Sequence, residues 1–319
     1  MNPEHTASSL LERIDRNRIE HCIRYLAQDP LPCRRLNYTV PGRDKCTLYE
    51  ADDFIRGELR NCGYPIEETA VEVQAFGRDV TKPLAHQYTG PNPSDPWYTA
   101  YNLCAKKTGI VAPEEVVVVV AHKDSQSWMD CGPGAYDNAS GTAAALEIAR
   151  VLSEYPSHRS LGFLFCNEEH TPWTSVVAAQ ELAASSLKTV AALNLDSLGG
   201  KSEEDIRAGI KTCSTRFTTP EGEVIADLMG RLNYERGIGL THRKYRCERP
   251  NDDDGSFVNA GIPAAVMVVG SFPYADPNYH TENDTFANVD IQNVYLSAQL
   301  ALTTVLHLDR HGVNTGYLS

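Results

Sequence analysis

Val116-Val-Val-Val-Val-Ala-His-Lys-Asp124 joins a run of apolar residues directly to three polar ones. Its first part, Val116–Ala121, is a continuous apolar run without polar alternation, which is typical of a strand covered on both faces. Such strands belong to sheets that have helices packed on each side. The run therefore predicts a central buried strand that ends in two polar side chains, His122 and Asp124.

Further buried strands, each followed by a helix, are predicted downstream of this strand. Three further apolar runs predict buried strands at Leu161–Cys166, Val190–Leu195 and Ala264–Val269. Apolar residues at helical spacing predict helices at 143–152, 174–187, 221–233 and 290–308. Because strand and helix alternate, the pattern predicts an α/β fold, a three-layer α/β/α sandwich around a central, largely parallel (mixed) sheet.

The first hundred residues are less regular. Helices are predicted at 8–28 and 47–62, a half-buried strand around 71–75 and a loop at 83–98. A length of 319 residues allows one large domain or two modest ones. No internal repeat separates two halves, so we expect a single domain, 1–319, with residues 1–40 as a helical extension packed on it.

Composition limits the class of partner. The net charge is −13, which argues against nucleic acid, because phosphate binding depends on clustered Lys and Arg. An acidic surface mainly keeps a protein in solution, although it also attracts substrates with a free amine. With 42% hydrophobic and 22% charged residues, the chain can form a sizeable core.

Three features of the sequence bear on the cellular location of the protein: its N-terminus, its apolar segments and its cysteines. The N-terminus has no basic start and no apolar stretch, so we expect no secretory signal. No apolar segment approaches the roughly 20 residues that cross a bilayer, so we expect no membrane partner. The nine cysteines are odd in number and form no Cys-x-x-Cys pair, which favours reduced thiols and a cytoplasmic protein.

Strong metal-binding side chains lie at the ends of the apolar runs or in the loops that follow them. They are His122, Asp137, Glu169, Asp196 and His280. In open α/β sheets, ligands bind beyond the carboxyl ends of the strands, so these side chains are expected to meet at one site. Two imidazoles and three carboxylates suit zinc, with manganese or cobalt as alternatives. The set is too large for one tetrahedral zinc, but two metals that share a carboxylate would use it fully.

Glu168-Glu169 is the most informative pair. Adjacent carboxylates at the mouth of a buried strand repel each other unless a cation or a proton intervenes. A metal resolves the repulsion if one glutamate ligates it and the other accepts a proton from the attacking water. Asp124 and Asp284 lie near His122 and His280 in sequence, and each could fix the tautomer of its histidine.

Each of these residues also has a structural interpretation. Asp137 precedes Asn-Ala-Ser-Gly and could be the N-cap of the following helix. Asp196 could cap a turn before Gly199-Gly200, and His122 with Asp124 could be a surface pair. It is the shared position at strand ends that favours the metal site.

In these motifs the chain resembles the co-catalytic zinc aminopeptidases, which include bacterial leucyl aminopeptidases. That family shares its fold with glutamate carboxypeptidases and glutaminyl cyclases. The resemblance runs from about 116 to 285 and rests on motifs in matching order, which are Ala-His-Lys-Asp-Ser (121–125), Gly-Ala-Tyr-Asp-Asn-Ala-Ser-Gly (134–141), Asn-Glu-Glu (167–169), Asn-Leu-Asp (194–196), Gly-Ile-Pro-Ala (261–264) and Tyr-His-Thr-Glu-Asn-Asp-Thr (279–285). It implies the zinc-exopeptidase (phosphorylase/hydrolase-like) fold.

The resemblance also implies roles for the site residues. One zinc would be held by His122 and Asp196 and a second by Glu169 and His280, while Asp137 bridges both. Glu168 would be the general base of amide hydrolysis.

The chain departs from the family pattern in three places. Asn-Glu-Glu is followed by His170 and Trp173 instead of a Gly-rich turn, and both could shape the pocket. The family's Ser-Asp-His is replaced by Asp252-Asp253-Asp254, so Asp253 and Asp254, with Tyr279, are further candidate pocket residues. An insertion at 125–133 carries Cys131, to which the sequence assigns no role, because a nucleophile would need a histidine partner.

The leading hypothesis is a metal-dependent exopeptidase that releases N-terminal residues from peptides. A carboxypeptidase or small-amide hydrolase is an alternative that needs a basic residue in the pocket, with Arg243, Lys244, Arg246 and Arg249 as candidates. Glutaminyl cyclisation, which uses one zinc on the same fold, is another. A non-catalytic binding domain is disfavoured because no expected ligand is missing.

Overall fold

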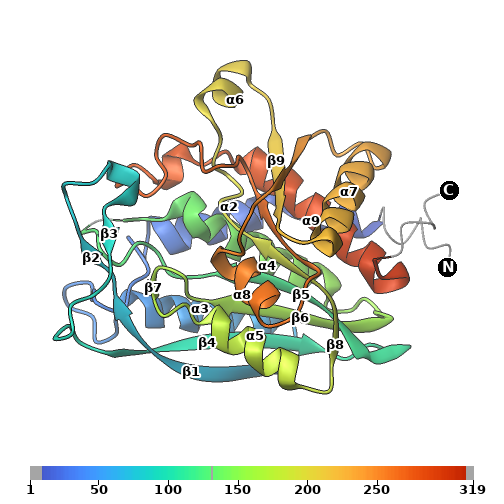
Figure 1. The fold of residues 1–319 in the computed structure, drawn as a ribbon, viewed down its shortest axis with the longest axis horizontal. Coiled ribbons are helices and arrows are strands. Elements are labelled where there is room, and N and C mark those ends of the chain that lie inside the picture. The colour runs from blue at the N-terminus through green and yellow to red at the C-terminus, as the bar shows by residue number, and fades with distance from the viewer. Residues whose placement is uncertain (1–8, 131, 314–319) are drawn as a thin grey trace.

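The computed structural model describes residues 9–130 and 132–313. Within them, one large mixed sheet has the strand order β10-β9-β11-β8-β5-β6-β4-β1-β7 (Figure 1). Its strands are β1 (Ile66–Ala75), β4 (Tyr98–Lys107), β5 (Ala112–His122), β6 (Arg159–Cys166), β7 (His170–Thr171), β8 (Lys188–Leu195), β9 (Thr212–Phe217), β10 (Thr241–Arg246) and β11 (Ala265–Val269). The central strands β11, β8, β5 and β6 are mutually parallel, and antiparallel pairs flank them on both sides.

Helices cover both faces of this sheet, which confirms the predicted three-layer fold class (Figure 1). One layer comprises α2 (Arg16–Ala27), α3 (Thr47–Asn61), α4 (Gly141–Leu152), α7 (Pro220–Glu235) and α9 (Ile291–His311). The other comprises α5 (Ser175–Ala184) and α8 (Asp252–Asn259). The short helix α6 (Glu203–Ala208) projects at the top of Figure 1, and β2 (Gly77–Arg78) pairs with β3 (Tyr88–Thr89) in a separate hairpin.

The valine run explains why β5 lies at the centre. Val117 and Val119 pack into the larger core with α4 and α9, while Val116, Val118 and Val120 pack into the smaller core on the opposite face. Side chains alternate between the faces of a strand, so a strand that is apolar at every position is stable only where both faces are covered.

The N-terminal helical segment is interrupted where a single helix was predicted. The apolar spacing predicts one helix over 8–28, but the helical residues in the described part of that range are 9–11 and α2, which begins at Arg16. The Asp15 side chain accepts a hydrogen bond from the backbone N–H of Asn17 at 2.8 Å and caps α2. α2 packs on α4 and α9, and it also contacts the turn at 135–140 that precedes α4.

Several elements have no apolar pattern in the sequence and were not predicted. They are β4, β9, β10 and α8. In β9, Ser214, Thr215 and Arg216 are all buried, so a polar sequence occupies an interior strand. α8 begins within three consecutive aspartates, which a pattern of apolar residues does not register. In the described part of the chain, no helix combines the length and apolar character that crossing a membrane requires.

Candidate metal centre

Adjacent parallel strands bring three of the predicted site segments together. His122 is the last residue of β5, Asp196 follows the end of β8, and Glu168-Glu169 follow the end of β6. β5 pairs in parallel with both β6 and β8, so the carboxyl ends of all three strands meet at one edge. The site is thus a direct consequence of the strand order.

Two loops complete the group. Asp137 lies in an irregular turn before α4 with φ −115° and ψ 89°, and His280 lies in the loop after β11 with φ +52°. Asp137 is not the cap of α4: the helix begins at Gly141, whose N–H donates to the side-chain oxygen of Asn138 at 2.8 Å. The interpretation of Asp137 as an N-cap is therefore wrong, and its carboxylate is left to face the histidines.

The structure places the five predicted ligands around one small volume. His122 Nε2 lies 3.2 Å from Asp137 Oδ1 and 3.4 Å from Asp196 Oδ1. On the other side, His280 Nε2 lies 3.1 Å from Asp137 Oδ2 and 3.1 Å from Glu169 Oε1. Asp137 thus presents one carboxylate oxygen to each imidazole.

These distances fit those between the donor atoms of a bound zinc ion. Donor atoms about 2.0–2.1 Å from a tetrahedral zinc lie about 3.3 Å from one another, which is the spacing seen here between imidazole and carboxylate atoms. Donor atoms of His122, Asp137 and Glu169 lie within 4.8 Å of one another, as do those of His122, Glu168 and Asp196. The exposed fractions of the five predicted ligands run from only 1% to 7%.

The charge of the site also calls for a cation. Burial raises the pKa of Glu169 to about 7, although His280 opposes the shift. Burial likewise raises the pKa of Asp196, while His122 acts in the opposite direction. Buried carboxylates at this density are stable only when they are protonated, paired or bound to a metal.

Asp124 organises the site from behind the ligands. Its Oδ1 lies 3.3 Å from His122 Nδ1, and its two oxygens accept hydrogen bonds from the backbone N–H groups of Glu168 and Glu169, each at 2.9 Å. The other oxygen also contacts His170 Nδ1 at 2.8 Å. Burial alone would raise the pKa of Asp124, but the hydrogen bonds with the two histidines outweigh it and hold the pKa below its ordinary value.

Asp284 does not orient His280 as predicted. Its carboxylate accepts hydrogen bonds from the backbone N–H groups of Tyr136 at 2.8 Å and Asp137 at 3.1 Å, so it supports the turn that carries Asp137. The second nitrogen of His280, Nδ1, instead lies 3.1 Å from the carbonyl oxygen of Ala85. Sequence proximity was misleading, because the loop folds Asp284 away from the imidazole.

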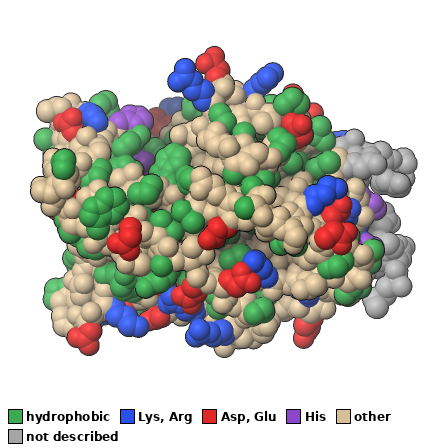
Figure 2. Space-filling model, turned by 60° about the horizontal axis from the view of Figure 1, so that its bottom comes forward, with side chains coloured by type: hydrophobic (Ala, Val, Ile, Leu, Met, Phe, Trp, Pro, Cys, Tyr) green, Lys and Arg blue, Asp and Glu red, His purple; other side chains and the backbone are tan. Residues whose placement is uncertain are grey.

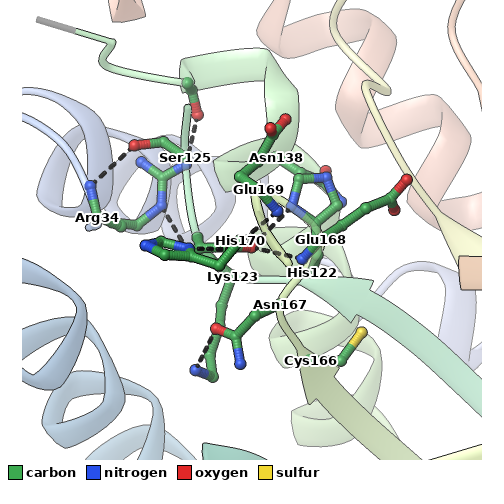
Figure 3. A network of polar contacts seen from close by, with 12 residues as sticks. Arg34, His122, Lys123, Ser125, Asn138, Cys166, Asn167, Glu168, Glu169 and His170 are labelled. Carbon is green, nitrogen blue, oxygen red and sulfur yellow. Dashed lines mark hydrogen bonds and ion pairs between the residues drawn. The ribbon is translucent and has the colours of Figure 1, made fainter. Parts of the chain in front are cut away.

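Glu168 differs from the five predicted ligands in its surroundings. It is partly exposed, it lines the cavity in front of the site, and its Oε2 atom has no hydrogen-bond partner among the described residues. Burial, followed by the nearby charges of Asp253 and Asp252, raises the pKa of Glu168 well above its ordinary value. Figure 3 shows Glu168 and Glu169 on one side of Lys123 and His170, with Arg34 on the other.

The cavity in front of these residues holds about 110 Å³ and is walled by aromatic rings. The rings are those of Phe76, Tyr88, Trp128, Trp173, Tyr274 and Tyr279. Tyr279 stacks on the His280 ring at a centroid distance of 3.8 Å, and Trp128 meets it edge-on at 5.1 Å. Apolar walls exclude water from a reacting centre and strengthen its electrostatic interactions.

Of the candidate pocket residues, Trp173 and Tyr279 line the cavity, whereas His170, Asp253 and Asp254 do not. His170 is fully buried, and its Nε2 accepts a hydrogen bond from the backbone N–H of Leu36 at 3.3 Å. Cys166 donates to Asp253 at 3.1 Å, and Asp254 is paired with Arg216. Cys131 lies outside the described residues.

The cavity includes residues that sequence reasoning missed. Phe76 precedes β2 and Tyr88 begins β3, Trp128 belongs to the 125–133 insertion, Asn251 precedes α8, and Tyr274 lies in the loop after β11. The loops that carry these residues have no periodic pattern from which their positions could be predicted. Only Trp128 could have been suspected of lying near the site, because it is close to His122 in sequence. Figure 2 shows apolar side chains gathered at the left of the molecule, where the hairpin lies.

Comparison with known proteins places the chain in a family. The model of "Peptidase family M28" matches residues 102–305. The chain belongs to this peptidase family. A "Probable zinc metalloprotease" of Pyrenophora tritici-repentis is 33% identical over 271 residues, which cover 74% of this chain and 54% of that protein. A "Probable aminopeptidase" of Saccharomyces cerevisiae is 24% identical over 220 residues, covering 65% and 57%. The chain therefore spans little more than half the length of these relatives.

Solved structures share the fold of this M28 chain. The aminopeptidase from Aneurinibacillus sp. strain AM-1 superposes with a TM-score of 0.68 at 16% identity, covering 95% of this chain and 96% of that one. A glutaminyl cyclase from Fimbriiglobus ruber superposes with a TM-score of 0.66 at 15% identity, covering 92% and 95%. Both likenesses concern the fold, and activity has to be argued from the site.

Proposed function

We propose that this M28 chain is a zinc-dependent aminopeptidase that hydrolyses the first peptide bond of a peptide with a free N-terminus. The observation that carries the proposal is the position of Asp137, whose two oxygens face His122 and His280. With Asp196 and Glu169 beside the two histidines, the chain offers two adjacent groups of donors that share one carboxylate. Paired metal sites of this kind serve aminopeptidases.

The chemistry divides between the metals and the protein. Zinc ions bound here would lower the pKa of a water molecule and polarise the scissile carbonyl. Glu168 then accepts the proton of the attacking water and returns it to the leaving amine, a role that its free Oε2 and raised pKa support. Asp124 keeps the tautomer and orientation of His122 fixed.

The pocket favours an amine over a carboxylate as the terminal group of the substrate. No lysine or arginine is among the described residues that line the cavity, whereas Glu168 and Asp252 are, the latter already paired with Arg216. Arg243 is held by Asp205 at 2.9 Å, and Lys244 is held by Glu223 and Asp227 at the surface. A carboxypeptidase would need one of these cations in the pocket.

Glutaminyl cyclisation is the second candidate, since a cyclase has the same fold. The complete set of five ligands argues for two metals and against the single zinc expected of a cyclase.

The test is a substrate panel. The purified protein is stripped with a chelator, reloaded with increasing zinc, and assayed with aminoacyl, C-terminally free and N-terminally glutaminyl peptides. We expect release of N-terminal residues alone, with activity reaching its plateau at two zinc ions per chain. Cyclisation at one zinc per chain, or cleavage that requires a free C-terminus, would overturn the proposal.

A further inference from the structure

Arg34 lies in the segment between α2 and α3 and is completely buried. Its guanidinium donates four hydrogen bonds, and all four acceptors are backbone carbonyl oxygens. Nε donates to Lys123 at 2.7 Å, Nη1 to Leu26 at 2.8 Å and to Pro133 at 2.7 Å, and Nη2 to Gly134 at 2.7 Å. One side chain from the N-terminal segment thus joins three separate stretches of backbone.

Two of those stretches carry metal-site residues. Lys123 stands between His122 and Asp124, and Gly134 precedes Asp137 by three positions. The backbone of Arg34 adds two further bonds on the same side, since its N–H donates to Ser125 Oγ and its carbonyl accepts from the Ser125 N–H, each at 2.9 Å. Figure 3 shows Arg34 and Ser125 packed beside the segment that leads to His122.

The contact at Gly134 is close enough to exclude any side chain there. A Cβ on Gly134 would lie 2.9 Å from Arg34 Nη2 and 2.3 Å from the carbonyl oxygen of Asp137, and the φ of Gly134 is +58°. The turn that carries Asp137 is therefore folded directly onto the guanidinium. Its position depends on Arg34 as well as on Asp284, which holds the N–H groups of Tyr136 and Asp137.

The chemistry of arginine suits this task. Guanidinium carries five N–H donors in a rigid, planar fork and stays protonated, whereas lysine has one ammonium on a flexible stem. The hydrogen-bond acceptors of Arg34 are neutral carbonyls, so they leave its positive charge uncancelled. The buried carboxyl groups of Asp284, Asp124 and Asp137, all of them in or beside the site, interact electrostatically with it.

We propose that Arg34 is a positioning residue of the metal centre. It holds the 122–125 and 134–137 segments at a fixed separation, so that His122 Nε2 and Asp137 Oδ1 lie close enough to bind the same metal ion. The alternative is that Arg34 only stabilises the fold, in which case its loss would lower stability and leave metal affinity unchanged. The inference depends on the proposed function in one respect: it assumes that His122 and Asp137 are metal ligands.

The experiment compares wild type, Arg34→Lys, Arg34→Met and a control, Arg159→Met. Arg159 lies at the opposite end of β6, where its side chain binds Glu115 at 2.7 Å and the Asp309 carbonyl. Zinc affinity is measured by competition with a chromophoric chelator, at a temperature where circular dichroism shows each variant folded. The visible absorption of the cobalt-loaded protein reports the ligand geometry. Thermal unfolding of the zinc-free protein reports stability.

We expect both Arg34 variants to bind zinc about 10- to 100-fold more weakly, as is usual when a supporting contact of a ligand is lost. Their cobalt spectra should also change, with Arg34→Lys closer to wild type than Arg34→Met. Arg159→Met should unfold at a lower temperature yet bind zinc like wild type. If Arg34→Met does not fold, Arg34→Lys decides.

Wild-type affinity and cobalt spectrum in a folded Arg34→Lys would overturn the proposal. Failure of both Arg34 variants to fold would also overturn it, because the role would then be general to the fold. Neither of these two results tests which substrate the protein cleaves. If wild type binds zinc but cleaves no peptide, the proposed function fails and the role of Arg34 stands; if wild type binds no zinc here, both fail.

Discussion

Glu168 and Glu169 are neighbours in sequence with different surroundings. Glu169 Oε1 lies 3.1 Å from His280 Nε2, while Glu168 lines the cavity and its buried Oε2 has no hydrogen-bond partner among the described residues. We predict that Glu168→Gln lowers kcat about 10²- to 10⁴-fold, because an amide cannot accept the proton. Its zinc content should match wild type when measured by elemental analysis.

The matched control is Glu169→Gln, which should lower zinc content together with activity. A Glu168→Gln protein that keeps more than a tenth of wild-type kcat would remove Glu168 from the role of base.

Asp124 supports two histidines and two backbone N–H groups at once. Asparagine has one acceptor oxygen, so Asp124→Asn would set an amide N–H₂ against N–H donors. We predict zinc binding weaker by about 10- to 100-fold, measured by chelator competition. Asp309→Asn is the control: Asp309 is equally buried and accepts from Tyr155 at 2.8 Å and from the Arg159 N–H at 2.7 Å. Equal zinc affinities in the two variants would count against a supporting role for Asp124.

The hairpin β2–β3 links the surface of the protein to the site. The carbonyl of Ala85, in its 3₁₀ turn (Leu84–His86), faces His280 Nδ1 at 3.1 Å, and Tyr88 lines the cavity. We predict that replacing residues 80–87 by Gly-Gly weakens zinc binding about 10-fold, because His280 loses the partner that orients it. The same replacement of α6, residues 203–208, should leave zinc binding unchanged. If the two deletion variants bound zinc with equal affinity, the hairpin would have no specific role in orienting His280.

Elements differ in how far the sequence predicts them. Val116–Val120 predicts β5 because both faces of that strand are apolar. β9 lies inside the same sheet, yet its Arg216 is buried through ion pairs with Asp252 and Asp254, partners that are distant in sequence. Burial of polar residues depends on tertiary contacts, so no local pattern reveals it. Asp15 is a different case, because its capping bond with Asn17 is local and marks the start of α2.

At the scale of the molecule, metal binding and stability should be linked. A ligand that binds only the folded state, present at 100 times its Kd, stabilises the fold by about 2.7 kcal/mol. We predict that a chelator lowers the melting temperature of wild type by about 5 °C or more, measured by calorimetry, and that added zinc restores it. The chelator should lower the melting temperature of His122→Ala by less than that of wild type, because the variant lacks a ligand of one of the two proposed ions. An unchanged wild-type melting temperature would indicate that zinc is not held at a folded site.

The sequence could predict which residues converge, because parallel strand ends meet at one edge of a sheet. It could not predict what surrounds them. Asp284 supports Asp137 and not His280, and Arg34 reaches the site from a segment with no motif. These contacts depend on how loops fold in three dimensions, which residue spacing does not encode.

The proposed metal centre requires Asp137 to lie between two metal ions. The direct measurement is anomalous X-ray scattering at the zinc edge from crystals of the reloaded protein. We predict two peaks about 3.5 Å apart, one beside His122 and Asp196 and one beside Glu169 and His280, with Asp137 between them. A single peak, or zinc bound away from Asp137, would contradict the account.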